Sequence, residues 1–191
     1  MQTHYFIALA LPLEVKQKLA ELYTVVSATF PFEKPVHLED YHITLAFLGA
    51  HNEKTLYTLM KNINNHVTNV GAFSLVIDGY GVFGNSSSPR IFWNRLQHEE
   101  ALFELQQIVA QHCHAHNIQL DARLYNPHIT VARKWAGDNS LDLEQLEQFN
   151  PLKNAPITFI ASEIVLYRTN LESIPKYENI FSIILKNHEP S

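Results

Sequence analysis

The spacing of hydrophobic residues along the chain predicts strands and helices in alternation. Apolar residues recur every three or four positions in three stretches that begin at Val15, Leu56 and Leu102, which is typical of amphipathic helices. A Gly- and Ser-rich connection is expected over 79–89 and a short acidic helix over 141–146. No low-complexity linker interrupts this order, so we expect a single domain over residues 1–191. Runs rich in β-branched and aromatic residues predict strands over 4–10, 41–48, 73–78, 90–96, 126–132, 157–167 and 177–185.

The two halves of the chain resemble each other at an offset of 86 residues, which is the separation of two histidines. Under this offset each half reads strand, helix, strand. We therefore expect a duplicated unit, and two repeats related by a pseudo-twofold axis would bring equivalent positions into one cleft. The aligned pairs are Phe6 with Phe92, Leu19 with Leu105, Leu22 with Ile108, and His42 with His128.

Composition and charge limit the functions that the chain can have. Of its 191 residues, 46% are hydrophobic and 17% are charged, which is typical of a globular protein with a real core. The formal net charge is −5, so the surface should not attract a long polyanion. Any contact with RNA must therefore be local, which favours recognition of a nucleic-acid end.

Other functional classes are disfavoured by what the sequence lacks. No apolar run approaches the roughly 20 residues that a membrane span needs, and the stretch from Met1 to Leu13 has no features of a secretory signal. Cys113 is the single cysteine, which excludes an intrachain disulfide and a thiolate-rich metal site. We therefore expect a cytoplasmic protein without a membrane partner.

A duplicated tetrapeptide carries the candidate chemistry: HITL over 42–45 and HITV over 128–131. Side chains alternate along a strand, so the His and Thr of each copy share one face while the apolar residues point into a core. Two imidazoles can exchange protons near neutral pH, and two hydroxyls can hold phosphate oxygens. A lone copy would indicate an ordinary, partly buried histidine. Its duplication at equivalent positions favours phosphoryl transfer without a metal.

These motifs resemble those of a known family. Together with YFIALALP near the start, HITLAFLG, a VFG before a strand, and PHITVAR, they are similar to the two-histidine (2H) phosphoesterase superfamily. The resemblance is greatest to its LigT-like branch, the RNA 2′,3′-cyclic phosphodiesterases, also called 2′-5′ RNA ligases. It implies an α+β fold of two pseudo-symmetric lobes, each an antiparallel sheet with outer helices, and a central cleft between them.

The resemblance also implies roles for residues. His42 would be the proton donor, His128 the proton acceptor, and Thr44 and Thr130 would bind the phosphate. The implied reaction hydrolyses a 2′,3′-cyclic phosphate at an RNA end or on a nucleotide to a 2′-phosphomonoester. Slow 2′-5′ joining would be its reverse. The resemblance implies that the protein needs no cofactor or metal and that it is a monomer.

Two further positions, five residues after each histidine, are substrate-binding candidates. Related proteins use this place near the substrate, which implies a role for Phe47 and Arg133. An odd offset, however, puts them on the opposite face of a regular strand, unless the strand ends or bulges there. A core Phe and a structural Arg are the alternatives. Aromatic residues that could stack a terminal base are Tyr5, Phe83, Trp93 and Tyr125.

Some patterns and functions compete with this interpretation. The residues 79–84 satisfy G-x-G-x-x-G, but a dinucleotide site should open a helix, and here a loop is expected to follow. His112 and His116 are one helical turn apart, yet without further ligands they indicate a solvated helix end. The alternative functions are a non-catalytic nucleotide-binding module and a phosphodiesterase acting on another cyclic or 2′-5′-linked nucleotide.

Overall fold

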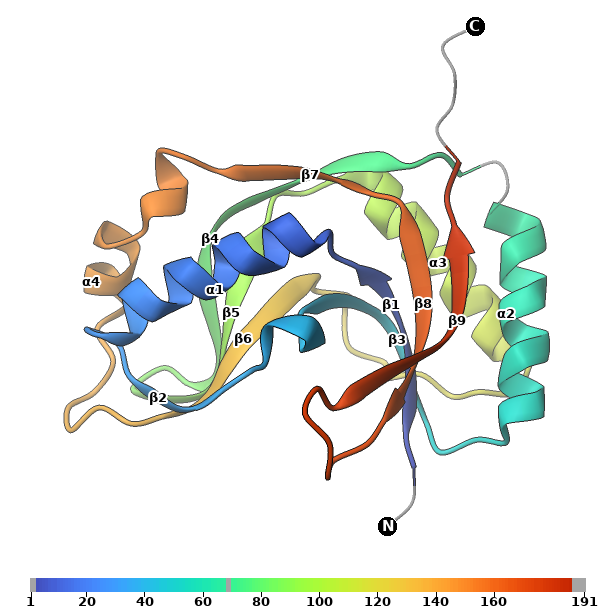
Figure 1. Cartoon of the computed structure of the whole chain (residues 1–191), viewed down its shortest axis with the longest axis horizontal. Helices are drawn as coiled ribbons and strands as arrows, with labels where there is room; N and C mark the ends of the chain where they lie inside the picture. The colour runs from blue at the N-terminus through green and yellow to red at the C-terminus, as the bar shows by residue number, and fades with distance from the viewer. Residues whose placement is uncertain (1–2, 68–69, 187–191) are drawn as a thin grey trace, which may run out of the picture.

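Two antiparallel sheets form the centre of the structure, a computed structural model that describes residues 3–67 and 70–186 (Figure 1). The first, sheet A, comprises in spatial order β3 (His42–Gly49), β1 (Tyr5–Ala10), β8 (Glu163–Thr169) and β9 (Tyr177–Ile184). The second, sheet B, comprises β2 (Phe32–Pro35), β6 (His128–Trp135), β5 (Ser88–Leu96), β4 (Phe73–Asn85) and β7 (Ile157–Ala161). The two sheets meet where β3 contacts β6.

Two of the long helices each contact the sheet to which the strand before them does not belong. The long helices are α1 (Leu13–Ser27), α2 (Glu53–Val67) and α3 (Glu100–Ala115), and the short ones are α4 (Leu143–Gln148), η1 (Leu38–Asp40) and η2 (Pro151–Lys153). Helix α1 follows β1 of sheet A but contacts β6 of sheet B, whereas α3 follows β5 of sheet B but contacts β3 of sheet A (Figure 1). Each half of the chain therefore contributes to both lobes of this α+β fold.

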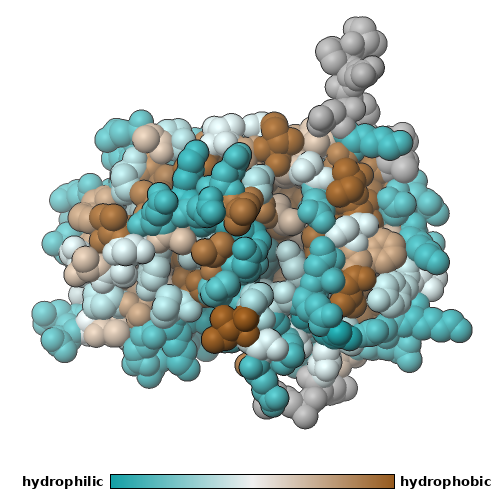
Figure 2. Space-filling view, in the orientation of Figure 1, coloured by the Kyte–Doolittle hydropathy of each residue, from teal (hydrophilic) through white to brown (hydrophobic). Residues whose placement is uncertain are grey.

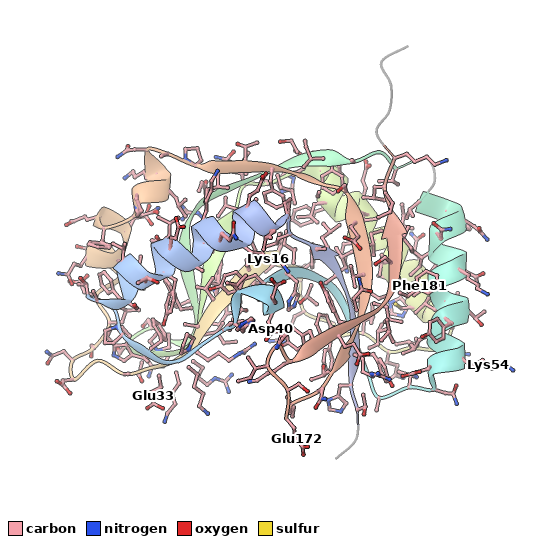
Figure 3. The ribbon with its side chains drawn as sticks, viewed as in Figure 1. Lys16, Glu33, Asp40, Lys54, Glu172 and Phe181 are labelled. Atoms are coloured by element: carbon pink, nitrogen blue, oxygen red, sulfur yellow. The ribbon has the colours of Figure 1, made fainter. Side chains whose placement is uncertain are left out.

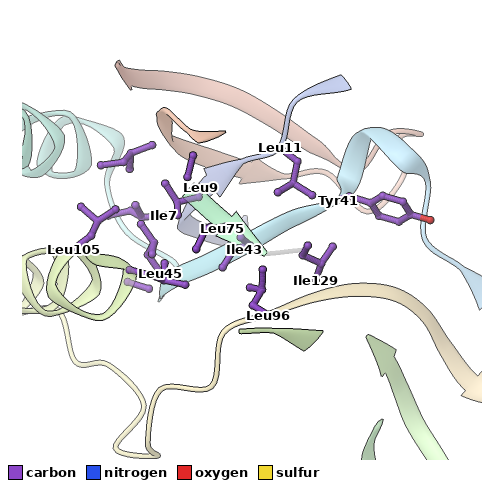
Figure 4. Packing of buried hydrophobic residues seen from close by; sticks show 14 of the residues in the cluster. Ile7, Leu9, Leu11, Tyr41, Ile43, Leu45, Leu75, Leu96, Leu105 and Ile129 are labelled. Carbon is purple, nitrogen blue, oxygen red and sulfur yellow. The ribbon is translucent and has the colours of Figure 1, made fainter. Parts of the chain in front are cut away.

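Apolar and polar side chains alternate along the two motif strands, so that one face of each strand packs into the core. Ile43 and Leu45 of β3, and Ile129 of β6, are nearly inaccessible to solvent, whereas the intervening histidines and threonines are only half-buried. Figure 4 shows these apolar side chains packed with Ile7 of β1 and Leu105 of α3. Burial of such side chains contributes about 1.5–3 kcal/mol each, so the apolar positions fix which face the histidines occupy.

The expected loop over 79–89 is wrong, because strand β4 continues to Asn85 and only two residues separate it from β5. Gly79 and Gly81 lie opposite Arg95 and Trp93, and a β-carbon on either glycine would come within 2.6 Å or 2.3 Å of those side chains. The glycines therefore make room for cross-strand neighbours. The G-x-G-x-x-G pattern lies within this strand and opens no helix.

The strand predicted over 157–167 is two strands in different sheets. β7 pairs with β4 of sheet B, and β8 pairs with β1 of sheet A, with Ser162 alone between them. A chain that passes from one sheet to the next keeps its extended, apolar character, so its sequence does not mark the change. The short strand β2 was not predicted either.

The strand pairing corrects one part of the aligned repeat. Ala8 lies opposite Thr44, while Trp93 lies opposite Thr130, so the first strands of the halves correspond at an offset of 85. A one-residue slip turns a side chain to the other face of its sheet. The predicted match of Phe6 with Phe92 is therefore wrong. The duplication of the unit stays a prediction.

None of the helices in residues 3–67 and 70–186 combines the length and the apolar character that crossing a membrane demands. Figure 2 shows polar and apolar side chains interspersed over the face in view.

Candidate active site

The predicted motif residues begin the strands β3 and β6, which lie at the meeting of the two sheets. His42 and Thr44 share one face of β3, and His128 and Thr130 share one face of β6. Strands β3 and β6 contact each other, which brings the two motifs together, and a positive charge on His128 lowers the pKa of His42. The structure therefore brings together the four residues that the duplicated motif predicts.

A bulge interrupts both motif strands at the same place. Ile7 and Ala8 of β1 pair with Ala46 and Thr44, which leaves Leu45 without a partner on β1. On β6, Phe92 and Trp93 pair with Ala132 and Thr130, which leaves Val131 unpaired in the same way. Side chains of both bulged residues and of those that follow them are buried.

Other segments bind the backbone carbonyls that the bulges release. Gln106 of α3 donates its side-chain amide to the carbonyl of Leu45 (3.4 Å), and the main-chain amide of Val36 donates to the carbonyl of Val131 (2.9 Å). The hydroxyl of Tyr125 donates to the carbonyl of Thr44 (3.1 Å). Unpaired buried carbonyls would cost free energy, so these contacts stabilise the bulged form of each strand.

The bulges determine the strand face on which Phe47 and Arg133, the two further substrate-binding candidates, lie. One extra residue reverses the alternation, so Phe47 and Arg133 return to the face of the histidines. Phe47 is 56% exposed, with His4 beside it at a ring separation of 5.9 Å. Arg133 is exposed, and its charge lowers the pKa of both histidines. A core Phe is thereby excluded, and contact of Phe47 or Arg133 with substrate stays a prediction.

Each imidazole is held by a carbonyl two residues before it. The Nδ1 of His42 lies 2.7 Å from the carbonyl oxygen of Asp40, and the Nδ1 of His128 lies 2.8 Å from that of Asn126. A carbonyl can only accept, so Nδ1 of each ring must carry the hydrogen. Nε2 is consequently the atom left for proton transfer on both rings.

Burial favours the neutral form of both histidines by lowering their pKa values. It lowers the pKa of His42 to about 4, an effect to which the charges of His128, Arg133 and Lys16 add and which the hydrogen bond to Asp40 opposes. Burial also lowers the pKa of His128. The Nε2 of His42 lies 3.0 Å from Oγ1 of Thr44, and a neutral ring accepts that hydroxyl hydrogen. An anion entering here would favour the charged ring.

Aromatic side chains surround the histidines, and the sequence did not indicate most of them. Phe6, Tyr177 and Tyr167 lie 4.7, 5.2 and 5.9 Å from the ring of His42, measured between centroids. Phe6 and Tyr167 form, with Ala8 and Val165, a small apolar cluster separate from the main core. Tyr177 also lies close enough to Arg133 for a hydrogen bond that lowers the pKa of the Tyr177 hydroxyl, although burial raises it more.

Of the four aromatic residues considered for base stacking, two lie beside His128 and pack against each other, with ring centroids 4.9 Å apart. Phe83 and Trp93 lie 4.8 and 5.7 Å from the ring of His128. Tyr5, in contrast, donates to Glu53 (3.0 Å), and the hydroxyl of Tyr125 is bound to Thr44. The last two therefore serve the scaffold.

His112 and His116, near the end of α3, are half-buried because they contact α2, so the predicted solvated helix end is only partly correct. The ring of His112 lies 4.5 Å from that of His66 on α2, and Nε2 of His116 lies 3.0 Å from the side-chain amide of Asn62. Their nearness to α2 could not be seen in the spacing. In the described ranges, no three His, Cys, Asp or Glu residues are placed to hold a metal ion.

Two contacting strands each present an imidazole beside a hydroxyl, which is the arrangement that the resemblance to two-histidine phosphoesterases implies. The chain belongs to the 2′-5′ RNA ligase superfamily, whose family model matches residues 11–172. An RNA 2′,3′-cyclic phosphodiesterase of Geobacillus stearothermophilus is 42% identical over 179 residues, which are 94% of this chain and 56% of that protein. The chain thus spans little more than half the length of this relative.

A second relative matches over nearly its whole length. An RNA 2′,3′-cyclic phosphodiesterase of Bacillus subtilis is 29% identical over 185 residues, 97% of this chain and 98% of that protein. Among solved structures, E. coli LigT complexed with 3′-AMP superimposes with a TM-score of 0.75 at 20% identity, covering 97% of this chain and 99% of that one. The shared fold of two antiparallel sheets with helices agrees with the lobes predicted above.

Proposed function

We propose that this protein hydrolyses 2′,3′-cyclic phosphates at RNA ends or on nucleotides to 2′-phosphomonoesters. The observation that carries the proposal is the matched pair of imidazoles, each with Nδ1 fixed by a carbonyl and Nε2 left for proton transfer. The names of the relatives, RNA 2′,3′-cyclic phosphodiesterases, support the same substrate class.

In the proposed reaction water attacks the phosphorus while His128 accepts its proton. The bond from phosphorus to the 3′ oxygen breaks, and His42 donates a proton to that oxygen, which leaves the phosphate on the 2′ oxygen. An acid or base of this kind contributes about 10²- to 10⁴-fold, so the pair would lower the barrier by roughly 5 to 11 kcal/mol. The reverse direction would join a cyclic end to a 5′-hydroxyl through a 2′-5′ bond.

The donor role assigned to His42 requires that the ring gain a proton when substrate binds. In the free protein its pKa is about 4, and its Nε2 accepts from Thr44. A phosphate anion at the site raises this pKa, because a nearby negative charge favours the imidazolium. At the same time Thr44 can turn its hydroxyl from His42 to a phosphate oxygen. Binding of the substrate would thus favour the protonated form of His42, which acts as the acid.

The remaining candidates would hold the substrate. Thr130 would bind a phosphate oxygen opposite Thr44, and Arg133 would neutralise charge that develops on the phosphoryl oxygens. Phe47, exposed at the edge of the same face, would contact the nucleoside. A cytoplasmic location and a monomeric state complete the proposal.

Product analysis tests this function. Purified protein is incubated with nucleoside 2′,3′-cyclic phosphates and with cyclic-ended oligonucleotides, and the phosphomonoesters are identified by ³¹P NMR. Formation of 2′-phosphates supports the proposal. Binding without turnover would indicate a nucleotide-binding module, and turnover of 2′-5′-linked oligonucleotides alone would indicate another phosphodiesterase; either result would overturn it.

A further inference from the structure

A buried acidic residue lies directly behind the proton-donor candidate. The side chain of Asp40 is only 4% exposed, although its residue type is rarely buried. Its carboxylate accepts hydrogen bonds from the main-chain amides of Lys176 (2.9 Å) and Tyr177 (3.1 Å), where β9 begins. Desolvating a carboxylate is costly, so the hydrogen bonds that the buried Asp40 accepts are needed to offset this cost.

The same residue holds the imidazole through its main chain. The carbonyl oxygen of Asp40 accepts the hydrogen of Nδ1 of His42 at 2.7 Å. Its amide donates to the carbonyl of His37 at 2.9 Å, which fixes the peptide in the short helix η1. One residue thus links His42 to a strand that lies more than 130 positions later in the chain.

A buried lysine holds the preceding peptide from the other side. Nζ of Lys16 donates to the carbonyl of Glu39 at 3.0 Å and pairs with the carboxylate of Glu39 at 3.1 Å. Lys16 lies on α1, and Figure 3 places it next to η1 and Asp40. The peptide behind His42 is therefore held by α1, η1 and β9 together.

The strand that Asp40 holds also supplies a wall of the site. Tyr177, whose amide binds Asp40, packs edge-on against the ring of His42 at 5.2 Å. Loss of the carboxylate would release both the carbonyl that orients Nδ1 and the aromatic ring beside it.

The residue whose carbonyl orients His128 is not held by a buried side chain in the way that Asp40 is held behind His42. Asn126 occupies the position before His128 that Asp40 occupies before His42, and it offers its carbonyl in the same way. Its side chain is exposed and makes no hydrogen bond or ion pair with the described residues, and Asn126 lies outside regular secondary structure. The two histidines therefore differ in how firmly their backbone is held.

We propose that Asp40 is a positioning residue that orients His42 as the proton donor, by fixing both its carbonyl partner and Tyr177. This inference rests on the proposed function, in which the donor must reach the departing 3′ oxygen. A ring displaced by about 1 Å can cost about 10²-fold in rate. The acceptor tolerates more movement, because water can adjust to it.

Two variants and two substrates test the role. Asp40→Asn keeps the size of the side chain, and Asp40→Ala removes it. With a nucleoside 2′,3′-cyclic phosphate, whose alkoxide must be protonated, kcat should fall about ten- to hundredfold. With a nucleotide 4-nitrophenyl ester, whose leaving group departs without a proton, kcat should change by less than about threefold. Equal losses with both substrates would show a merely structural role and would overturn the proposal.

An NMR measurement decides the same question without turnover. Long-range ¹H–¹⁵N spectra report which nitrogen of His42 carries hydrogen. Wild type should show hydrogen on Nδ1, and the Asp40 variants should show a mixture of the two tautomers. An unchanged His42 spectrum would overturn the proposal. If wild type hydrolysed neither substrate, the proposed function would fail, while this spectrum would still decide the positioning.

Asp142 provides the matched control. Its carboxylate also accepts a main-chain amide, that of Gln145 at 2.9 Å, but it caps α4 away from the motif strands. Asp142→Asn should leave both the His42 spectrum and the ratio of the two rates as in wild type. A change equal to that of Asp40→Asn would mean that any loss of such a bond disturbs the site, which contradicts a specific role.

Discussion

The neutral His42 in the free protein makes folding stability depend on pH in a calculable way. Burial lowers the pKa of His42 from 6.5 to about 4, so between these values the unfolded chain binds a proton that the folded chain does not. The associated stability is complete above pH 6.5 and is lost as the pH falls toward 4. The loss amounts to about 2 kcal/mol at pH 5 and about 3 kcal/mol at pH 4.

Urea unfolding of wild type and His42→Gln between pH 7 and pH 4 measures this contribution. Carboxylates titrate in both proteins, so the difference between the two curves isolates the imidazole. Wild type should lose about 3 kcal/mol more than the variant over this range. His114→Gln, which removes an exposed imidazole from α3, is the matched control. Parallel curves for wild type and His42→Gln would refute the reasoning, because His42 would then titrate alike in both states.

Three further predictions concern activity. Chelation with EDTA should leave turnover intact, because imidazoles and hydroxyls fill the acid, base and anion-binding roles; loss that a divalent ion restores would contradict this. Thr44→Val and Thr130→Val should each weaken binding of inorganic phosphate about five- to tenfold but keep the shape of the pH profile, which titration calorimetry and kinetics can check. Since burial lowers the pKa of both His42 and His128, the bell in log kcat/KM should peak below pH 6.5, and a peak above pH 7 would count against it.

The chemistry of the site could be predicted from the sequence because it depends on local alternation. Within HITL and HITV the identity of the buried face follows from the two apolar residues, and the structure keeps that face. The positions five residues on depend instead on a bulge, which requires a partner strand of fixed register. Nothing in the motif itself indicates that Leu45 has no paired residue on β1 and that Val131 has none on β5.

The supporting residues could not be predicted because they come from distant segments. Tyr177 reaches His42 from β9, and Asp40 is important only because the amides of that strand lie behind it. In the same way, the change of sheet at Ser162 depends on which strands lie alongside. The sequence predicts a loop at Gly81 because it does not reveal that the ring of Trp93 packs over this glycine. Contacts of this kind follow from the tertiary fold alone.

The cooperation of the two histidines is the central claim, and it is tested most directly by comparing His42→Ala, His128→Ala and the double variant. The measurement is kcat/KM for a nucleoside 2′,3′-cyclic phosphate, with circular dichroism to verify that each variant is folded. Each single variant should lose at least about 10²-fold, and the double variant should be scarcely worse, because acid and base act in one step. A single variant that kept more than about a tenth of wild-type activity, or losses that multiplied in the double variant, would contradict the paired mechanism.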